Sequence, residues 1–372
     1  MPHLFIKNEK AIKYPIKQNG VEFLFQVNDL IACKIENKEF FISLQNRGEK
    51  SILKYDKITR PISSYLKKAY NEFISLSKAE IISSNIEGIK DKQPNQYLIT
   101  IEDNLQFEEE IIVEIGFGSG RHLLHLAQKY PEKIVIGIEI HKPSIEQVLK
   151  RCDNENITNV RVIDYDGRLV LSKLKSNKVH SIYVHFPVPW DKKPNRRVIS
   201  DYFINESIRV LQKDGFLHLR TDSDNYFEYS FNEFMKLDKN ELKLYKNRDL
   251  EVSSKYEDRW KKQNKNIYDI YMINETISEE LNENFDFSFG CLDASKASDK
   301  AYIFDEFVIH FEKIAKIDEK KTLIKLTMGA FERPEHLYII AGKESYYFNK
   351  PVYHKLNQKA HNKLKEILSC QK

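Results

Sequence analysis

Strands that alternate with helices along the middle of the chain constrain its fold more than any other feature of the sequence. Residues 111–115 and 134–139 are almost wholly apolar, which is typical of strands buried on both faces of a parallel sheet. The alternation predicts an α/β domain with a parallel sheet. The further strands are expected over residues 160–163, 181–185, 215–221, near 242–245 and over 267–273, and the helices over residues 122–130, 144–151, 167–174 and 201–211.

Two other regions flank this pattern, so we expect three parts in the chain of 372 residues. Residues 1–105 form a β-rich N-terminal extension, with a polar linker near 90–96. Residues 106–275 form the α/β domain, and residues 276–372 an α+β C-terminal extension that closes with a basic helix. The pattern leaves open whether the two extensions are separate caps or one composite lobe.

Bulk composition excludes few classes of protein. The 59 basic side chains nearly balance the 55 acidic ones, so the net charge of +4 gives no argument for nucleic acid by itself. No apolar run reaches the roughly 18 residues of a membrane helix, and the N-terminus lacks a signal-peptide core. The four cysteines have no paired spacing, which favours a reduced, cytoplasmic protein without disulfides or a metal site. They are Cys33, Cys152, Cys291 and Cys370.

The segment that follows the strand 181–185 indicates chemistry on a nucleobase. Pro187 and Pro189 bracket a single residue, Val188, and so stiffen the loop. Trp190 offers a flat face on which a base could stack, although it could equally pack beneath the loop as an apolar anchor. A basic run follows at residues 192–197, which suggests an anionic polymer as the substrate.

The glycine-rich loop after residue 115 predicts a nucleoside site. Its glycines have the spacing G-x-G-x-G, which differs from the G-x-G-x-x-G of dinucleotide-binding loops. Glu139 ends the next strand and could accept hydrogen bonds from ribose hydroxyls, while Asp164 and Asp166 follow the third strand and could face an adenine. A nucleoside without a diphosphate favours S-adenosylmethionine over NAD. The alternative is a tight turn beside solvated carboxylates.

These residues together resemble the bacterial tRNA (guanine-N7)-methyltransferases. The resemblance covers residues 106–275, and the two flanks look like extensions of the compact bacterial members. It implies a Rossmann-like class I methyltransferase sheet and methylation at N7 of a guanosine in the variable loop of tRNA. The motifs that carry it are Glu114-Ile115-Gly116-Phe117-Gly118, Gly137-Ile138-Glu139, Asp166, Phe186-Pro187-Val188-Pro189-Trp190, Thr221-Asp222 with Tyr226, and Ser254-Lys255-Tyr256-Glu257.

The resemblance also implies roles for individual residues. Those that would hold S-adenosylmethionine are Glu114, Gly116, Gly118, Glu139 and Asp166. Those that would hold the guanosine are Lys192, Asp222, Ser254 and Glu257. The family usually has an aspartate, treated as catalytic, at the position of Val188; Asp191 is a possible substitute. Ser254 and Tyr256 are mild replacements of threonine and phenylalanine.

The chemistry of guanine assigns the two catalytic candidates. N7 carries a lone pair and no proton, so methyl transfer depends on positioning and needs no general base. Asp222 and Glu257 can accept from N1–H and the exocyclic amine and can stabilise the cationic product ring. Asp222 could instead be the N-cap of the following helix.

Basic residues are expected to contact tRNA phosphates, or else to form a solvated lysine-rich face. They are Lys192, Lys193, Arg196, Arg197, Arg259, Lys261, Lys262 and Lys265. Val188 motivates one alternative, a tRNA-binding protein of this fold with weak or no catalysis. A further alternative is a methyltransferase that acts on another RNA, which the flanking regions would select. The expected partner is tRNA, and a monomer is favoured, although the sequence does not determine the oligomeric state.

Overall fold

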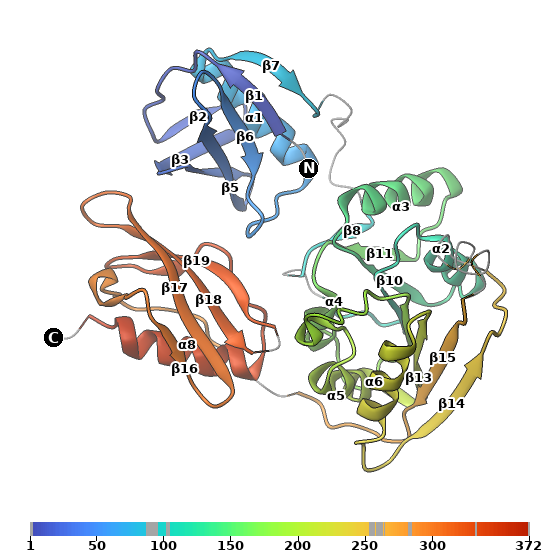
Figure 1. The fold of residues 1–372 in the computed structure, drawn as a ribbon. Helices are drawn as coiled ribbons and strands as arrows, with labels where there is room; N and C mark the ends of the chain where they lie inside the picture. The colour runs from blue at the N-terminus through green and yellow to red at the C-terminus, as the bar shows by residue number, and fades with distance from the viewer. Residues whose placement is uncertain are drawn as a thin grey trace. The chain divides into compact units, whose positions relative to one another are not determined.

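The chain forms two compact units in a computed structural model (Figure 1). One unit spans residues 95–284, and the other combines residues 1–94 with residues 285–372. The sequence left open whether the flanks fold together, and in the structure they do. The division into three domains at the predicted boundaries stays a prediction. The structure describes residues 3–86, 96–101, 105–252, 257, 263, 265–281, 285–331 and 333–370.

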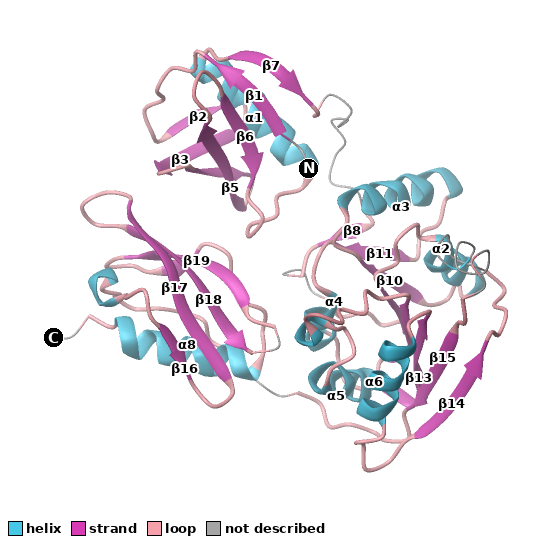
Figure 2. Ribbon diagram, viewed as in Figure 1, coloured by secondary structure: helices cyan, strands magenta, loops and turns pink. Residues whose placement is uncertain are grey.

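An eight-stranded sheet organises the unit 95–284 and confirms the predicted α/β class (Figure 2). Six of its strands, β8 to β13, are parallel to one another, and β14 and β15 add an antiparallel pair at one edge. In spatial order the strands are β14 (Glu241–Lys246), β15 (Tyr268–Ile273), β13 (Leu211–Thr221), β12 (Val179–His185), β9 (Ile111–Ile115), β10 (Ile134–Ile138), β11 (Val160–Ile163) and β8 (Leu98–Ile99).

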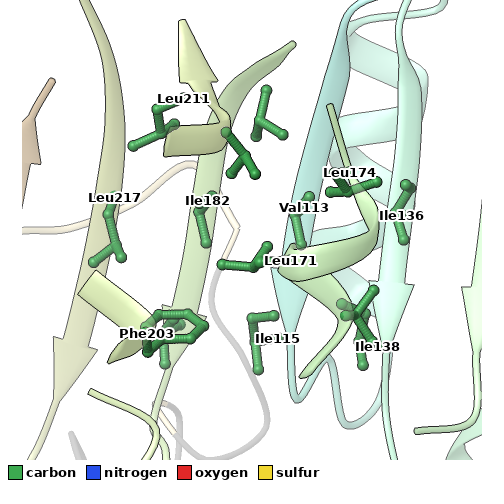
Figure 3. Packing of buried hydrophobic residues seen from close by; sticks show 14 of the residues in the cluster. Val113, Ile115, Ile136, Ile138, Leu171, Leu174, Ile182, Phe203, Leu211 and Leu217 are labelled. Atoms are coloured by element: carbon green, nitrogen blue, oxygen red, sulfur yellow. The ribbon is translucent and has the colours of Figure 1, made fainter. Parts of the chain in front are cut away.

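Helices cover both faces of this sheet, because successive strand residues point to opposite sides. Val113, Ile115 and Ile182 face a cluster that includes Leu171 and Phe203 (Figure 3). Ile112 and Val135 face the other way, toward Leu123, Leu124 and Val148. The helices are α2 (Arg121–Lys129), α3 (Lys142–Glu155), α4 (Gly167–Val170), α5 (Asp201–Val210) and α6 (Asp224–Phe234), with 3-10 turns η1 (Leu171–Lys173) and η2 (Pro194–Arg196).

The second unit contains two sheets, each with one helix. The seven-stranded sheet has α1 (Ser63–Ser77) and the order β2 (Ile16–Gln18), β3 (Val21–Val27), β4 (Leu30–Ile35), β5 (Lys38–Asn46), β6 (Ser51–Tyr55), β1 (His3–Lys7), β7 (Glu80–Ser84). The five-stranded sheet runs β16 (Ala301–Ile303), β17 (Phe307–Lys316), β18 (Thr322–Ala330), β19 (Glu335–Ala341), β20 (Tyr346–Tyr347), with η3 (Ala294–Lys296) and α8 (Lys355–Leu368). Phe41 of the seven-stranded sheet stacks on Phe348, with 4.1 Å between the ring centroids, within an apolar cluster to which both sheets contribute.

A disulfide joins Cys291 to Cys370 and shows that the expectation of four unpaired cysteines was wrong. The two residues are 79 positions apart, and their spacing could not reveal the pairing. Tertiary structure brings them together, because Leu292 forms an isolated bridge with Ser369 at the end of α8. Cys33 and Cys152 are free and buried. Among the described residues, no helix has the length and apolar character that crossing a membrane requires.

Candidate active site

The glycine loop at the end of β9 forms an open cradle. Gly116, Gly118 and Gly120 have φ values of 72°, 50° and 69°, which side chains disfavour. A Cβ on Gly116 would meet no atom within 4 Å, and one on Gly118 only a backbone oxygen at 4.0 Å. A Cβ on Gly120 would instead collide with Val148 at 2.1 Å. The first two glycines therefore leave room for a ligand, and the third allows the loop to pack on α3.

Glu139 lies against this cradle, at the end of β10. Its Oε2 accepts from the backbone N–H of Gly118 at 3.0 Å. Its Oε1 accepts from the backbone N–H groups of Ile140 and His141 at 2.8 and 3.0 Å. Oε2, which accepts only one of these three bonds, has capacity for a further donor. The backbone thus fixes the carboxylate in the place predicted for a ribose contact.

Asp166 follows β11, the next strand along, as the sequence predicts. Its carboxylate caps α4 by accepting from the backbone N–H of Arg168 at 3.0 Å, and the Arg168 guanidinium pairs with it at 2.7 Å. Asp164 pairs with Lys142 at 2.6 Å. The acidic residues after β10 and β11 are therefore oriented by neighbouring groups.

Glu114 lies inside the unit, one residue before the end of β9. It is only 3% exposed, and its Oε2 lies 3.3 Å from Nδ1 of His122 in α2. The ring of His122 lies 4.6 Å from the ring of His185, the last residue of β12. The structure thus brings Glu114, a predicted cofactor residue, close to two histidines, and the sequence analysis assigned a role to neither of them.

The loop after β12 is held in one shape by Arg197. Its Nε donates to the Pro189 carbonyl at 2.7 Å, its Nη2 pairs with Asp191 at 3.3 Å, and its guanidinium lies 4.3 Å from the ring centroid of Tyr229. Arg197 is 8% exposed. The prediction that it contacts phosphates is wrong, because its guanidinium is used within the fold.

The exposed residues of the same loop fit a role in binding. Val188 is 59% exposed and Trp190 37% exposed, and the Arg196 guanidinium lies 5.2 Å from the Trp190 ring centroid. Trp190 is therefore no buried anchor, and the interpretation as a stacking surface agrees better with the structure. Lys192 is exposed. Asp191 pairs with Arg197, so its carboxylate is used in holding the loop.

Asp222 follows β13 and does not cap the next helix. The cap is Ser223, whose hydroxyl accepts from the backbone N–H of Tyr226 at 3.2 Å. The alternative interpretation of Asp222 as an N-cap is therefore wrong. Its carboxylate instead pairs with Lys265 at 3.0 Å.

Glu257 is buried and paired with Arg220 of β13. The distance from Arg220 Nη2 to Glu257 Oε1 is 2.8 Å, and Arg220 Nη1 lies 2.6 Å from both oxygens of Asp269. Both Arg220 and Asp269 are fully buried. Ser254, Arg259, Lys261 and Lys262 lie outside the described residues, so their predicted roles stay predictions.

Asp269 also begins a histidine chain that the sequence analysis missed. His218 Nε2 lies 2.7 Å from Asp269 Oδ1, and His218 Nδ1 lies 3.0 Å from His185 Nε2. Burial lowers the pKa of His185 well below its usual range, and the charges of His122, His218 and Arg220 add to this effect. Burial also lowers the pKa of His218, against the raising effect of Asp269. The sequence did contain a signal for this chain: His218 and Arg220 occupy alternate positions in the otherwise apolar strand 215–221.

Comparison with known proteins gives the family. A family model described as "Putative methyltransferase" matches residues 108–270. A tRNA (guanine-N(7)-)-methyltransferase of Campylobacter fetus is 39% identical over 393 residues, 100% of this chain and 99% of that protein. Proteins with the same name from Wolinella succinogenes and Helicobacter pylori are 40% and 38% identical, with at least 99% of each chain covered. The chain belongs to this family.

The alignments extend over the whole chain, so these relatives share both flanking regions. Solved structures of other methyltransferases match a smaller share of the chain. An rRNA methylase from Streptococcus thermophilus has 12% identity and a TM-score of 0.34, covering 45% of this chain and 88% of that one. The 16S rRNA methyltransferase KamB has 14% identity and a TM-score of 0.36, covering 45% and 89%.

The family model and the full-length relatives show that the chain is an S-adenosylmethionine-dependent methyltransferase. The residues present fit this cofactor. A Cβ on Gly116 or Gly118 would extend into open space, so the loop can approach a ligand closely. Glu139 offers a fixed carboxylate beside that space, where ribose hydroxyls can donate to it.

Proposed function

We propose that this protein transfers a methyl group from S-adenosylmethionine to N7 of a guanosine in the variable loop of tRNA, which forms 7-methylguanosine. The observation that carries the proposal is the identity of about 40% over the full length with relatives named tRNA (guanine-N(7)-)-methyltransferase. The predictions of a cytoplasmic location and a monomer accompany the proposal.

The cofactor side of the site is built from the ends of adjacent strands. Gly116 and Gly118 let the backbone approach the cofactor, and Glu139 accepts from its ribose hydroxyls. Asp166 lies after β11, where it can face the adenine, while its carboxylate remains tied to Arg168. Glu114 is the least exposed of these candidates. When bound, S-adenosylmethionine supplies an electrophilic methyl group on a sulfonium.

The guanosine side depends on two carboxylates. Asp222 and Glu257 accept from N1–H and the exocyclic amine of guanine, which turns N7 toward the cofactor side. The Arg220 guanidinium orients Glu257. Lys192 lies in the exposed part of the loop and contacts phosphate.

This arrangement requires no general base, because N7 carries no proton. Positioning of the two reactants supplies much of the rate. The product ring is cationic, and fixed carboxylates beside it stabilise the developing charge. A valine at position 188 is compatible with this mechanism, since its exposed side chain shapes the loop and moves no proton.

The test is a transfer assay with purified protein, S-adenosylmethionine and unmodified tRNA, followed by nucleoside mass spectrometry. We expect 7-methylguanosine, mapped to the variable loop. The same assay with ribosomal RNA separates the alternative of another RNA substrate. Binding of tRNA without product would favour the second alternative, a tRNA-binding protein of this fold, for which Val188 is the motivating observation.

A further inference from the structure

Five side chains form a continuous hydrogen-bonded network that leads from the end of β12 to Glu257. His185 Nε2 lies 3.0 Å from His218 Nδ1 of β13, and His218 Nε2 lies 2.7 Å from Asp269 Oδ1 of β15. Asp269 accepts two bonds of 2.6 Å from Arg220, and Arg220 donates to Glu257 at 2.8 Å. The network therefore ends on one of the two carboxylates assigned to guanine.

The middle of the network is buried, and His218 is held in one orientation. His218, Arg220 and Asp269 are each at most 1% exposed. The His218 ring stacks on the Tyr271 ring of β15, with 4.0 Å between the centroids and 10° between the planes. A buried polar group that loses its partner cannot turn to water instead. Each bond of the network therefore constrains the next group.

The Asp269 carboxylate fixes the tautomers of both imidazoles. An ionised carboxylate only accepts hydrogen bonds, so His218 Nε2 carries the proton that Asp269 accepts. Burial lowers the pKa of His218 and of His185, which keeps both rings neutral. A neutral ring has a single N–H, so His218 Nδ1 accepts and His185 Nε2 donates to it. Donation thus runs in one direction, from His185 through His218 to Asp269.

Asp269 is the group through which the histidines act on Arg220. Its Oδ1 accepts from His218 Nε2 and also from Arg220 Nη1. Without the His218 donor, the carboxylate of Asp269 is free to turn. The guanidinium is a rigid planar fork, so a turn of Asp269 moves the nitrogen of Arg220 that binds Glu257. The orientation of Glu257 therefore depends on a histidine that acts through two intervening groups.

We propose that His218 is a positioning residue for guanosine recognition, which holds Asp269 and Arg220 so that Glu257 meets guanine in a fixed orientation. The inference rests on the proposed function, because it adds His218 to the guanosine side of that site. His185 orients the His218 ring in turn. Because the network contains none of the glycines of the cofactor cradle, its loss should affect the use of tRNA and leave cofactor binding in place.

The experiment compares His218→Gln with His218→Asn in the full-length protein. The amide nitrogen of glutamine reaches the position of imidazole Nε2 and can still donate to Asp269, whereas the shorter asparagine reaches only the position of Nδ1. We measure kcat/KM for unmodified tRNA at saturating S-adenosylmethionine. His218→Asn should lower it about 10–100-fold, because a hydrogen bond to a charged group is lost, and His218→Gln should stay within about threefold of the wild type. The Kd for S-adenosylhomocysteine, measured by calorimetry, should change less than about threefold in both variants.

Glu257→Gln tests whether His218 acts through this carboxylate. When Glu257→Gln is already present, His218→Asn should lower kcat/KM for tRNA by less than about threefold, because the group that His218 positions is no longer ionised. Effects of the two substitutions that multiply fully would overturn the assignment and indicate that His218 serves the stability of the sheet.

The matched control is His180→Asn. His180 lies near the start of β12, and its Nδ1 lies 3.2 Å from the hydroxyl of Ser181. This variant should keep the kcat/KM of the wild type. Far-UV circular dichroism checks that each variant is folded.

A second measurement needs no variant. In ¹⁵N NMR spectra of the wild type with labelled histidine, His185 and His218 should both be neutral at neutral pH, with the proton on Nε2. A His218 ring that is charged or protonated on Nδ1, or equal kcat/KM values in His218→Asn and His218→Gln, would overturn the inference while the proposed function stands. A wild type that forms no 7-methylguanosine would instead overturn the proposed function, and the inference with it.

Discussion

Arg220 and Glu257 form a buried ion pair with a nitrogen–oxygen distance of 2.8 Å. The same guanidinium contacts both oxygens of Asp269, and the Arg220 carbonyl accepts from the backbone N–H of Phe186 at 2.7 Å. Asp222 lies two residues further along the chain. Arg220 therefore connects the loop of residues 186–197, which carries Pro187, Pro189 and Trp190, with Asp222 and Glu257. These are three parts of the proposed guanosine site.

We predict that Arg220→Met destabilises the protein by about 3–5 kcal/mol, because it leaves Glu257 and Asp269 as uncompensated buried charges. Urea unfolding measures this change in the free energy of unfolding. Arg151→Ala is the control, since it removes a partly exposed pair with Glu155 within α3 and should change stability by less than about 1 kcal/mol. Equal stability of Arg220→Met and wild type would contradict the claim that Arg220 neutralises the buried charges of Glu257 and Asp269.

Asp222 and Ser223 are neighbours whose substitutions should have opposite consequences. Asp222→Asn keeps the size of the side chain and removes the carboxylate that accepts from guanine. We therefore expect kcat to fall about 100-fold or more, while the temperature of thermal unfolding stays unchanged. Ser223→Ala removes the cap of α6 and should cost about 1 kcal/mol of stability while activity per folded molecule is retained. Steady-state kinetics and thermal unfolding separate the two. Retained kcat in Asp222→Asn would exclude its catalytic role.

Glu139→Gln tests the cofactor side. A carboxylate that accepts from ribose hydroxyls contributes about 1.5–3 kcal/mol, so affinity for S-adenosylhomocysteine should fall roughly 10–150-fold. Isothermal titration calorimetry measures the Kd. Glu146→Gln, on the exposed surface of α3, is the control and should leave the Kd unchanged. An unchanged Kd in Glu139→Gln would place the ribose elsewhere.

The second unit should lose stability in mild acid because of His361. Burial lowers the pKa of this side chain to about 4, against about 6.5 in the unfolded chain. Between these values the unfolded chain binds the proton and the folded chain does not, so stability falls as pH falls. From about pH 7.5 to about pH 5.5 the loss is about 1.4 kcal/mol.

Hydrogen exchange of α8, which contains His361, measures this loss, and His361→Gln should reduce the pH dependence. The bonds of His361 to Tyr347 and to the Ser288 carbonyl are given up in that variant, so the slope with pH is the readout and not the stability at one pH. An equal slope in the variant and the wild type would assign the effect to other groups.

The central sheet could be predicted from the sequence because its strands are buried on both faces. Strands were predicted over the mostly apolar residues 111–115 and 134–139, and the structure has strands over Ile111–Ile115 and Ile134–Ile138. The edge strand Glu80–Ser84 has mostly exposed residues and no alternation of apolar side chains, so it went unpredicted. Leu98–Ile99 is too short to show a period, and it was assigned to the N-terminal extension although it pairs with β11.

The site could be predicted in part, and the limit was long-range pairing. Glu139 and Asp222 follow strands, and a strand end is visible in the sequence. Arg197 looks like its basic neighbours, and only the Tyr229 ring and the Pro189 carbonyl distinguish it. The Arg220–Glu257 pair joins residues 37 positions apart, and no spacing rule predicts it.

The central claim, that the chain with Val188 is a working tRNA methyltransferase, is tested most directly by single-turnover transfer from labelled S-adenosylmethionine to unmodified tRNA. Wild type and Val188→Asp are compared with protein in excess, and 7-methylguanosine is quantified by nucleoside mass spectrometry. We predict complete conversion by the wild type, at a rate that Val188→Asp does not raise more than about tenfold, because N7 needs no base. Binding of tRNA without product by the wild type, with product restored by Val188→Asp, would contradict the account.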